Sequence, residues 1–182
     1  MLKLKSSIIV GIIALLAVNA QPQNAHESAL TTLDYAEIEQ LNAHYAHAID
    51  SCADNGKEWA NLFTSDGVFM YFTGKAEGRE ALTALAGSHH FCDLPRTPLT
   101  VRHININVMI EPSSGGAIGK SYVLFLRVGK DGRPGDIEEA GKYYDVYVTT
   151  SVGWRFKSRR YVRGLDLSLI PESELLHHPL PH

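Results

Sequence analysis

The sequence has only two cysteines among its 182 residues and no excess of basic charge. Two cysteines are too few for a small scaffold held together by disulfides. Seventeen Lys and Arg against 20 Asp and Glu give a net charge of −3, which argues against a nucleic-acid partner. Apolar residues make up 45% of the chain and charged residues 20%, so it has the composition of one globular domain with a core.

Several catalytic motifs are missing as well. The sequence contains no glycine-rich phosphate loop, no Gly-x-Ser-x-Gly turn and no Cys–His nucleophile pattern. None of the nine His residues lies at metal-motif spacing with a third ligand, so we predict no metal site. These absences favour an enzyme without a cofactor, such as a lyase or an isomerase.

Long apolar runs are absent except at the N-terminus. Two lysines precede an apolar run over residues 7–18, which is typical of a secretory signal and short for a membrane-spanning helix. Small side chains at Val18 and Ala20 suit cleavage after Ala20, and an uncleaved anchor is the alternative. We therefore predict a signal peptide over residues 1–20, export to the periplasm or the medium, and no membrane attachment after cleavage.

The mature chain begins with a polar, flexible leader over residues 21–30, followed by a helix. Asp34 and Glu37 match an N-cap and its partner three residues later, which predicts that the helix begins at Asp34. Apolar residues at helical spacing extend it to about Cys52. Export would allow Cys52 to pair with Cys92, and two buried thiols are the alternative.

Strand patterns dominate the second half of the chain. Before them we expect a short helix containing Trp59, a strand over residues 68–72 and a helix over residues 78–85. Helices followed by an antiparallel sheet predict a single α+β domain, which ends before a tail over residues 165–182. Four later segments have strand patterns: 99–110, 117–128, 142–150 and 154–163.

Several local sequences together resemble the SnoaL-like branch of the nuclear transport factor 2-like superfamily. They occur in order as residues 45–50, 62–69, 78–82, 102–108 and 153–160. The resemblance implies one domain over residues 31–164, a conical half-barrel of about three helices against a curved, mostly antiparallel sheet of about five to six strands. It also implies a homo-oligomer, either a dimer or a trimer. Its members include dehydratases, isomerases, cyclases and non-catalytic binders, so the fold leaves the activity open.

Asp50 and His103 stand where the dehydratase and dehydrochlorinase members carry a catalytic pair. In such a pair a neutral His removes a proton from carbon, while the carboxylate fixes its tautomer and stabilises the imidazolium. The ordinary alternatives are an Asp that accepts hydrogen bonds in a turn and a structural His in a strand. Tyr45 lies five residues before Asp50, as in bile-acid and scytalone dehydratases, which implies a hydroxyl that polarises a carbonyl; a core aromatic is the alternative.

The remaining site residues are supporting candidates. Asn107 shares strand parity with His103 and would bind substrate or donate to the sheet. The resemblance favours Arg159 as a catalytic contact for an anion or leaving group, whereas period-two counting places Arg160 on the apolar face. A bulge in this strand would reconcile the resemblance with the counting. Three aromatic residues fit either a pocket wall or the core: Phe69, Tyr71 and Tyr143.

The sequence thus predicts an exported lyase without a cofactor, a dehydratase that acts on a hydrophobic, cyclic hydroxy-carbonyl compound. In this interpretation His103 is the base, Asp50 orients it, and Tyr45 polarises the substrate with help from Arg159 or Asn107. A strand His departs from the Asp base of ketosteroid isomerases, which favours elimination over isomerisation. The alternatives are a non-catalytic carrier of a small hydrophobic molecule and an isomerase or cyclase of the same fold.

Overall fold

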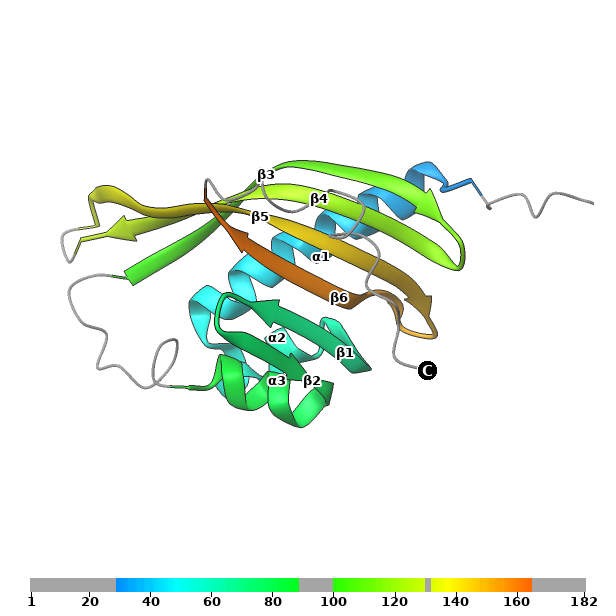
Figure 1. Cartoon of the computed structure of the whole chain (residues 1–182), viewed down its shortest axis with the longest axis horizontal. Helices are drawn as coiled ribbons and strands as arrows, with labels where there is room; N and C mark the ends of the chain where they lie inside the picture. Colours follow the sequence, from blue (N-terminus) through cyan, green and yellow to red (C-terminus); the bar gives the residue numbers. More distant parts are fainter. Residues whose placement is uncertain (1–28, 89–99, 130–131, 165–182) are drawn as a thin grey trace, which may run out of the picture.

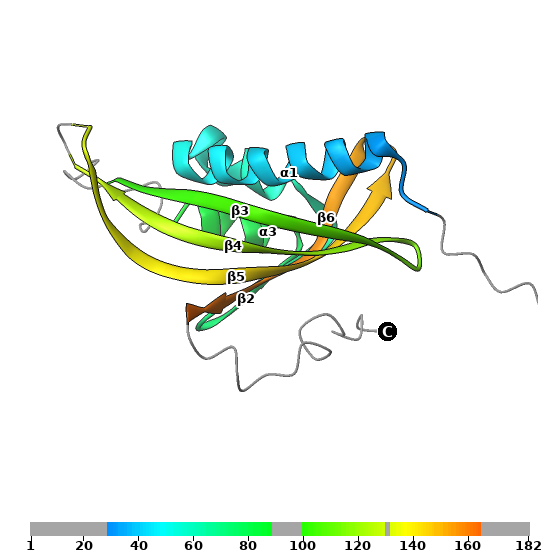
Figure 2. The same ribbon diagram turned by 90° about the horizontal axis from the view of Figure 1, so that it is seen from above.

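One long helix lies along the concave side of a strongly curved sheet (Figures 1 and 2). The computed structural model describes residues 29–88, 100–129 and 132–164. Helices come first and a mostly antiparallel sheet follows, so the predicted α+β half-barrel is confirmed. The elements are α1 (Thr32–Ser51), a 3₁₀ turn (Ala53–Gly56), α2 (Lys57–Ala60), β1 (Phe63–Tyr71), β2 (Gly74–Glu77), α3 (Gly78–Ala86), β3 (Thr100–Ser113), β4 (Gly116–Val128), β5 (Pro134–Thr150) and β6 (Gly153–Arg163).

The described strands form a single six-stranded sheet in the order β2-β1-β6-β5-β4-β3. All neighbouring strands are antiparallel except β1 and β6, which run parallel. The register shifts within each of the three pairs β1–β6, β3–β4 and β5–β6, and twice within β4–β5. Such bulges bend strands and increase their twist, which lets the sheet wrap around α1.

The start of α1 corrects the sequence prediction. Thr31, not Asp34, is the N-cap, and α1 begins at Thr32. The Thr31 hydroxyl accepts the Asp34 backbone N–H at 3.2 Å, and the Asp34 carboxylate accepts the Thr31 backbone N–H at 2.7 Å. This is a capping box with Asp in place of the usual Glu, so the motif lies three residues earlier than the Asp34–Glu37 pair suggested. Asp34 also accepts the Trp154 indole N–H at 3.0 Å, which ties the helix to β6.

Two strands differ from their predicted extents. β1 begins at Phe63, before the predicted strand over residues 68–72, and includes an irregular stretch between Phe63 and Val68. β5 begins at Pro134, well before the predicted strand over residues 142–150. Nearly all side chains described between residues 135 and 140 are exposed, so no apolar alternation marks this part of β5. The short β2 strand was not predicted.

The core is formed where the apolar face of α1 meets the aromatic side chains of the sheet and α2. Burial of each large apolar side chain contributes roughly 1.5–3 kcal/mol, so this contact is a main source of stability. No helix in the described ranges is long and apolar enough to cross a bilayer. The largest buried apolar side chains include Ile38, Tyr45, Trp59, Phe63, Tyr143, Tyr147 and Phe156.

Cys52 ends α1 in a left-handed backbone conformation with φ of 53°. Its sulfur is in a disulfide rather than a free thiol. The other cysteine of the chain, Cys92, lies outside the described residues. The described part therefore excludes a free thiol at Cys52.

Candidate functional site

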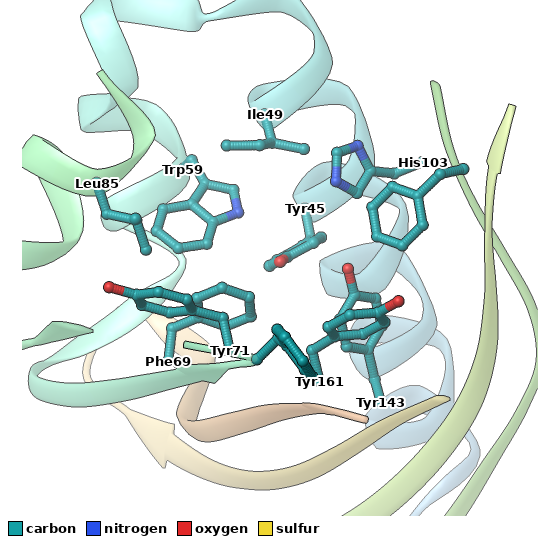
Figure 3. Close-up of a pocket in the computed structure, with 11 residues that line it drawn as sticks. Tyr45, Ile49, Trp59, Phe69, Tyr71, Leu85, His103, Tyr143 and Tyr161 are labelled. Atoms are coloured by element: carbon teal, nitrogen blue, oxygen red, sulfur yellow. The ribbon is translucent and has the colours of Figure 1, made fainter. Parts of the chain in front are cut away.

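A cavity of about 210 Å³ lies between the last turns of α1, the α2–α3 region and the sheet (Figure 3). Among the residues that the structure describes, its wall is almost entirely aromatic and contains no Lys, Arg, Asp or Glu side chain. Such a wall suits a neutral, flat ligand. The lining residues are Tyr45, Ile49, Trp59, Phe69, Tyr71, Phe72, Leu85, His103, Phe125, Tyr143 and Tyr161.

Asp50 and His103 meet at one side of this cavity. Asp50 lies in the last turn of α1, and His103 lies in the first half of β3. The His103 Nδ1 atom is 2.6 Å from Asp50 Oδ1, and the His103 backbone N–H donates to Asp50 Oδ2 at 3.1 Å. An ionised carboxylate can only accept, so this contact places a proton on Nδ1. The other ring nitrogen, Nε2, faces the cavity (Figure 3).

Tyr45 brings a phenolic hydroxyl into the same space. The ring is only 2% exposed, and its centroid lies 6.4 Å from that of His103 in an edge-on arrangement. Burial raises the pKa of Tyr45, and the Arg159 charge and a hydrogen bond from Tyr143 oppose that rise only in part. The hydroxyl therefore stays protonated and acts as a hydrogen-bond donor at neutral pH.

Arg159 lies behind Tyr45 instead of lining the cavity. Its side chain is fully buried, and its Nε and Nη2 atoms each donate to the Asp145 carboxylate at 2.8 Å. Nη2 also donates to Asn42, and the guanidinium carbon lies 4.1 Å from the Tyr45 ring centroid and 4.2 Å from that of Tyr143. The resemblance implied that Arg159 contacts a substrate anion directly. Its position behind Tyr45 does not provide that contact.

A bulge explains why period-two counting favoured the wrong arginine. The β5–β6 register skips Lys157 between the pairs Val146–Ser158 and Tyr147–Phe156. Beyond that point Arg159 faces the interior with Phe156, and Arg160 is half-buried. The resemblance thus favoured Arg159, which is the buried arginine, whereas period-two counting favoured Arg160.

A second bulge removes Asn107 from the site. Asn107 has φ of 54°, and the β3–β4 register shifts between Ile106 and Met109. The parity shared with His103 is lost there, so Asn107 is exposed and lies outside the cavity wall. The three expected aromatic residues, in contrast, all line the cavity: Phe69, Tyr71 and Tyr143.

Several residues that line the cavity are not among the predicted site residues. Trp59 lies in a short helix whose apolar pattern indicates only a core position. Phe125 and Tyr161 lie in predicted strands, where nothing in the sequence separates a cavity wall from the core. Phe125 is the direct β-sheet partner of His103, with ring centroids 4.8 Å apart. Knowledge of the register would have identified Phe125, but strand alternation alone gives no register. The described ranges contain no cluster of three His, Cys, Asp or Glu side chains that could hold a metal ion.

A model of the SnoaL-like domain family matches residues 31–160. The chain belongs to the SnoaL-like family. The match covers both Asp50 and His103 and nearly all of the structured domain. A search among curated proteins finds no match to this sequence.

Several solved structures share the fold of this SnoaL-like chain. An NTF2-like protein from Novosphingobium aromaticivorans shares the fold, with a TM-score of 0.64, 21% identity, and coverage of 79% of this chain and 88% of that one. A candidate scytalone dehydratase from the same species is 26% identical, with a TM-score of 0.57 and coverage of 73% and 85%. A protein from Catenulispora acidiphila in complex with S-DNPA is 28% identical, with a TM-score of 0.58 and coverage of 72% and 95%.

Proposed function

We propose that this protein is a lyase of the dehydratase type that needs no cofactor. The observation that carries the proposal is the 2.6 Å contact between Asp50 and His103 Nδ1 at the wall of an aromatic cavity. A carboxylate in that place fixes the tautomer that leaves Nε2 as the basic nitrogen. It also stabilises the imidazolium that forms when Nε2 takes a proton.

In the proposed reaction, His103 Nε2 removes a proton from a carbon next to a carbonyl group. The electron pair of the broken C–H bond forms a C=C bond, and the C–O bond to a hydroxyl on the next carbon breaks. The proton held by His103 returns to the departing oxygen, so one water molecule leaves and no external oxidant or reductant is required. Tyr45 donates to the carbonyl oxygen as negative charge develops there.

The substrate class follows from the cavity and the relatives. Aromatic walls, with no charged side chain among the described lining residues, favour a hydrophobic, cyclic hydroxy-carbonyl compound. The relative from Catenulispora acidiphila solved with S-DNPA supports the binding of a small molecule, and the candidate scytalone dehydratase supports elimination. A carrier with the same cavity is the second candidate, because every lining feature would also suit binding alone.

The dyad can be tested by turnover of a panel of cyclic β-hydroxy ketones. We expect His103→Ala to lower kcat by about 10²–10⁴-fold, the usual contribution of a positioned base. Asp50→Asn should also lower mainly kcat, because an amide cannot balance an imidazolium. The double variant should be little worse than the worse single variant, since the two residues act as a unit. His44→Ala, an exposed His on α1, is the matched control and should leave kcat unchanged.

Three results would contradict parts of this assignment. Full turnover by a folded His103→Ala protein would remove His103 as the base. Tight binding of panel compounds with no turnover by the wild type would favour the carrier instead. Strictly additive losses in the double variant would separate the two residues into independent roles.

Export is a second part of the proposal. The basic start, the apolar run over residues 7–18 and the small residues before position 21 support a cleaved signal peptide. The disulfide at Cys52 adds support, because such bonds persist mainly in oxidising compartments. The homo-oligomer implied by the family stays a prediction.

A further inference from the structure

The indole N–H of Trp59 is a buried donor in the cavity wall. Trp59 is 1% exposed, and its Nε1 atom has no hydrogen-bond partner of ordinary geometry in the described part of the chain. Buried polar groups are almost always paired, and a donor left unpaired is costly to the folded state. A donor of this kind at a cavity wall indicates an acceptor on the ligand.

The Tyr45 hydroxyl also has a hydrogen to donate. Hydrogen bonding from Tyr143 and Trp59 lowers the pKa of Tyr45, although the Trp59 N–H does not reach ordinary hydrogen-bond geometry. Burial more than offsets this effect and keeps the hydroxyl protonated, so it can donate to an oxygen of the ligand. The Arg159 guanidinium, stacked on the Tyr45 ring at 4.1 Å, holds the ring in place from behind.

The two donors belong to neighbouring side chains of the cavity wall. The Trp59 and Tyr45 ring centroids are 5.5 Å apart, and Figure 3 shows the Trp59 nitrogen directed into the space bounded by Ile49, Tyr45 and His103. If a carbonyl oxygen of the ligand is bound between the two donors, the carbon next to the carbonyl group can lie toward His103. The hydroxyl of Tyr161, by comparison, already donates to Glu139.

We propose that Trp59 Nε1 and the Tyr45 hydroxyl bind one carbonyl oxygen of the ligand, and that the ligand is a neutral aromatic ketone or a ketone conjugated to a ring. A neutral ligand suits a wall whose described residues carry no charged side chain, and a flat ring suits its aromatic faces. Arg159 is a positioning residue in this arrangement, because it contacts the Tyr45 ring and does not line the cavity. The reaction of such a ligand rests on the proposed function, but its binding does not.

Acetophenone is a suitable probe, because it has one ring, one carbonyl group and no charge. We expect its carbonyl stretching band to move to lower frequency on binding to the wild type, as hydrogen bonds weaken the C=O bond. Trp59→Phe and Tyr45→Phe should each remove part of that shift and weaken binding about fivefold, the usual effect of one lost hydrogen bond. Trp154→Phe is the matched control, because Trp154 donates to Asp34 far from the cavity, and it should change neither quantity.

A measurement on the wild type covers the case in which Trp59→Phe fails to fold. In ¹⁵N-labelled protein the two indole N–H signals are separated by assignment with Trp154→Phe. Addition of acetophenone should move the Trp59 signal to higher proton chemical shift and leave the Trp154 signal in place. An unmoved Trp59 signal with saturated probe, or no binding of acetophenone, would overturn the proposal.

The outcome is separable from that of the proposed function. His103→Ala should still bind acetophenone with the full carbonyl shift, since the base does not contact the oxygen. A wild type that shifts the carbonyl band but converts no substrate would end the lyase proposal and leave this inference standing. Suppose that the wild type converts substrate, but folded Trp59→Phe shifts the carbonyl band of acetophenone as far as the wild type does. The lyase proposal would then stand, and this inference would fail.

Discussion

Arg159 and Asp145 form the only fully buried ion pair found within the described ranges, with both side chains at 0% exposure. Burial by itself would lower the pKa of Arg159, but the Asp145 carboxylate more than offsets this and raises it. Arg159 therefore stays charged at every practical pH, and loss of its partner cannot be relieved by loss of a proton. The Tyr147 hydroxyl adds a third hydrogen bond to Asp145 at 2.7 Å.

We therefore expect Asp145→Ala to lower the free energy of unfolding by about 3–5 kcal/mol, the usual cost of an unpaired buried charge. The exposed Asp136→Ala should change it by less than about 0.5 kcal/mol. The double variant Asp145→Leu/Arg159→Met removes both charges and should recover much of the loss. Urea denaturation followed by circular dichroism measures all three; equal effects of Asp145→Ala and Asp136→Ala would show that the pair adds nothing.

At the scale of the elements, the capping box at the start of α1 provides a separate test. Thr31→Ala should lower the free energy of unfolding by about 1 kcal/mol, because the Asp34 backbone N–H loses its acceptor. Thr32→Ala, one residue later and also exposed, is the control and should cost much less. The Thr31 side chain and backbone lower the pKa of Asp34 in the folded state. That stabilisation is present above the unfolded-state pKa and is lost as pH falls through the folded one, so the difference between the two variants should become smaller in acid.

Periodicity predicted the elements well but could not predict the bulges. The helical spacing in α1 and the alternation in β3, β4 and β6 gave these elements to within a few residues, and the family order placed Asp50 and His103. Bulges arise from register between strands, which a single sequence does not encode locally. Two of them decide that Arg159 faces inward and Asn107 faces solvent. Trp59 escaped notice for another reason, since an unpaired N–H becomes visible only when all its neighbours are known.

At the scale of the whole molecule, the site is assembled from distant parts of the chain. The base comes from β3, its carboxylate from α1 and one proposed oxygen donor from α2. The curved sheet brings them together around the aromatic cavity.

The export proposal predicts the mass of the mature protein. Expression of the full chain in a bacterial host should yield a periplasmic form that begins at Gln21, because small residues stand at the expected cleavage site. Intact-mass spectrometry measures this directly. A variant with Leu15→Arg and Leu16→Arg interrupts the apolar run and should stay in the cytoplasm at full length. Recovery of the wild type at full length from the periplasm would indicate an uncleaved anchor.

The parallel pairing of β1 with β6 has a consequence for synthesis. β1 ends at Tyr71 and β6 begins at Gly153, so the strand that flanks β1 in the centre of the sheet is the last one made. Until it emerges from the ribosome, the aromatic face of α1 has no complete surface to pack on. We therefore expect the domain to fold only after β6 has been made, and slowly, because contacts distant in sequence close late. Under the export proposal, this delay would keep the chain unfolded while it is threaded through a translocation pore.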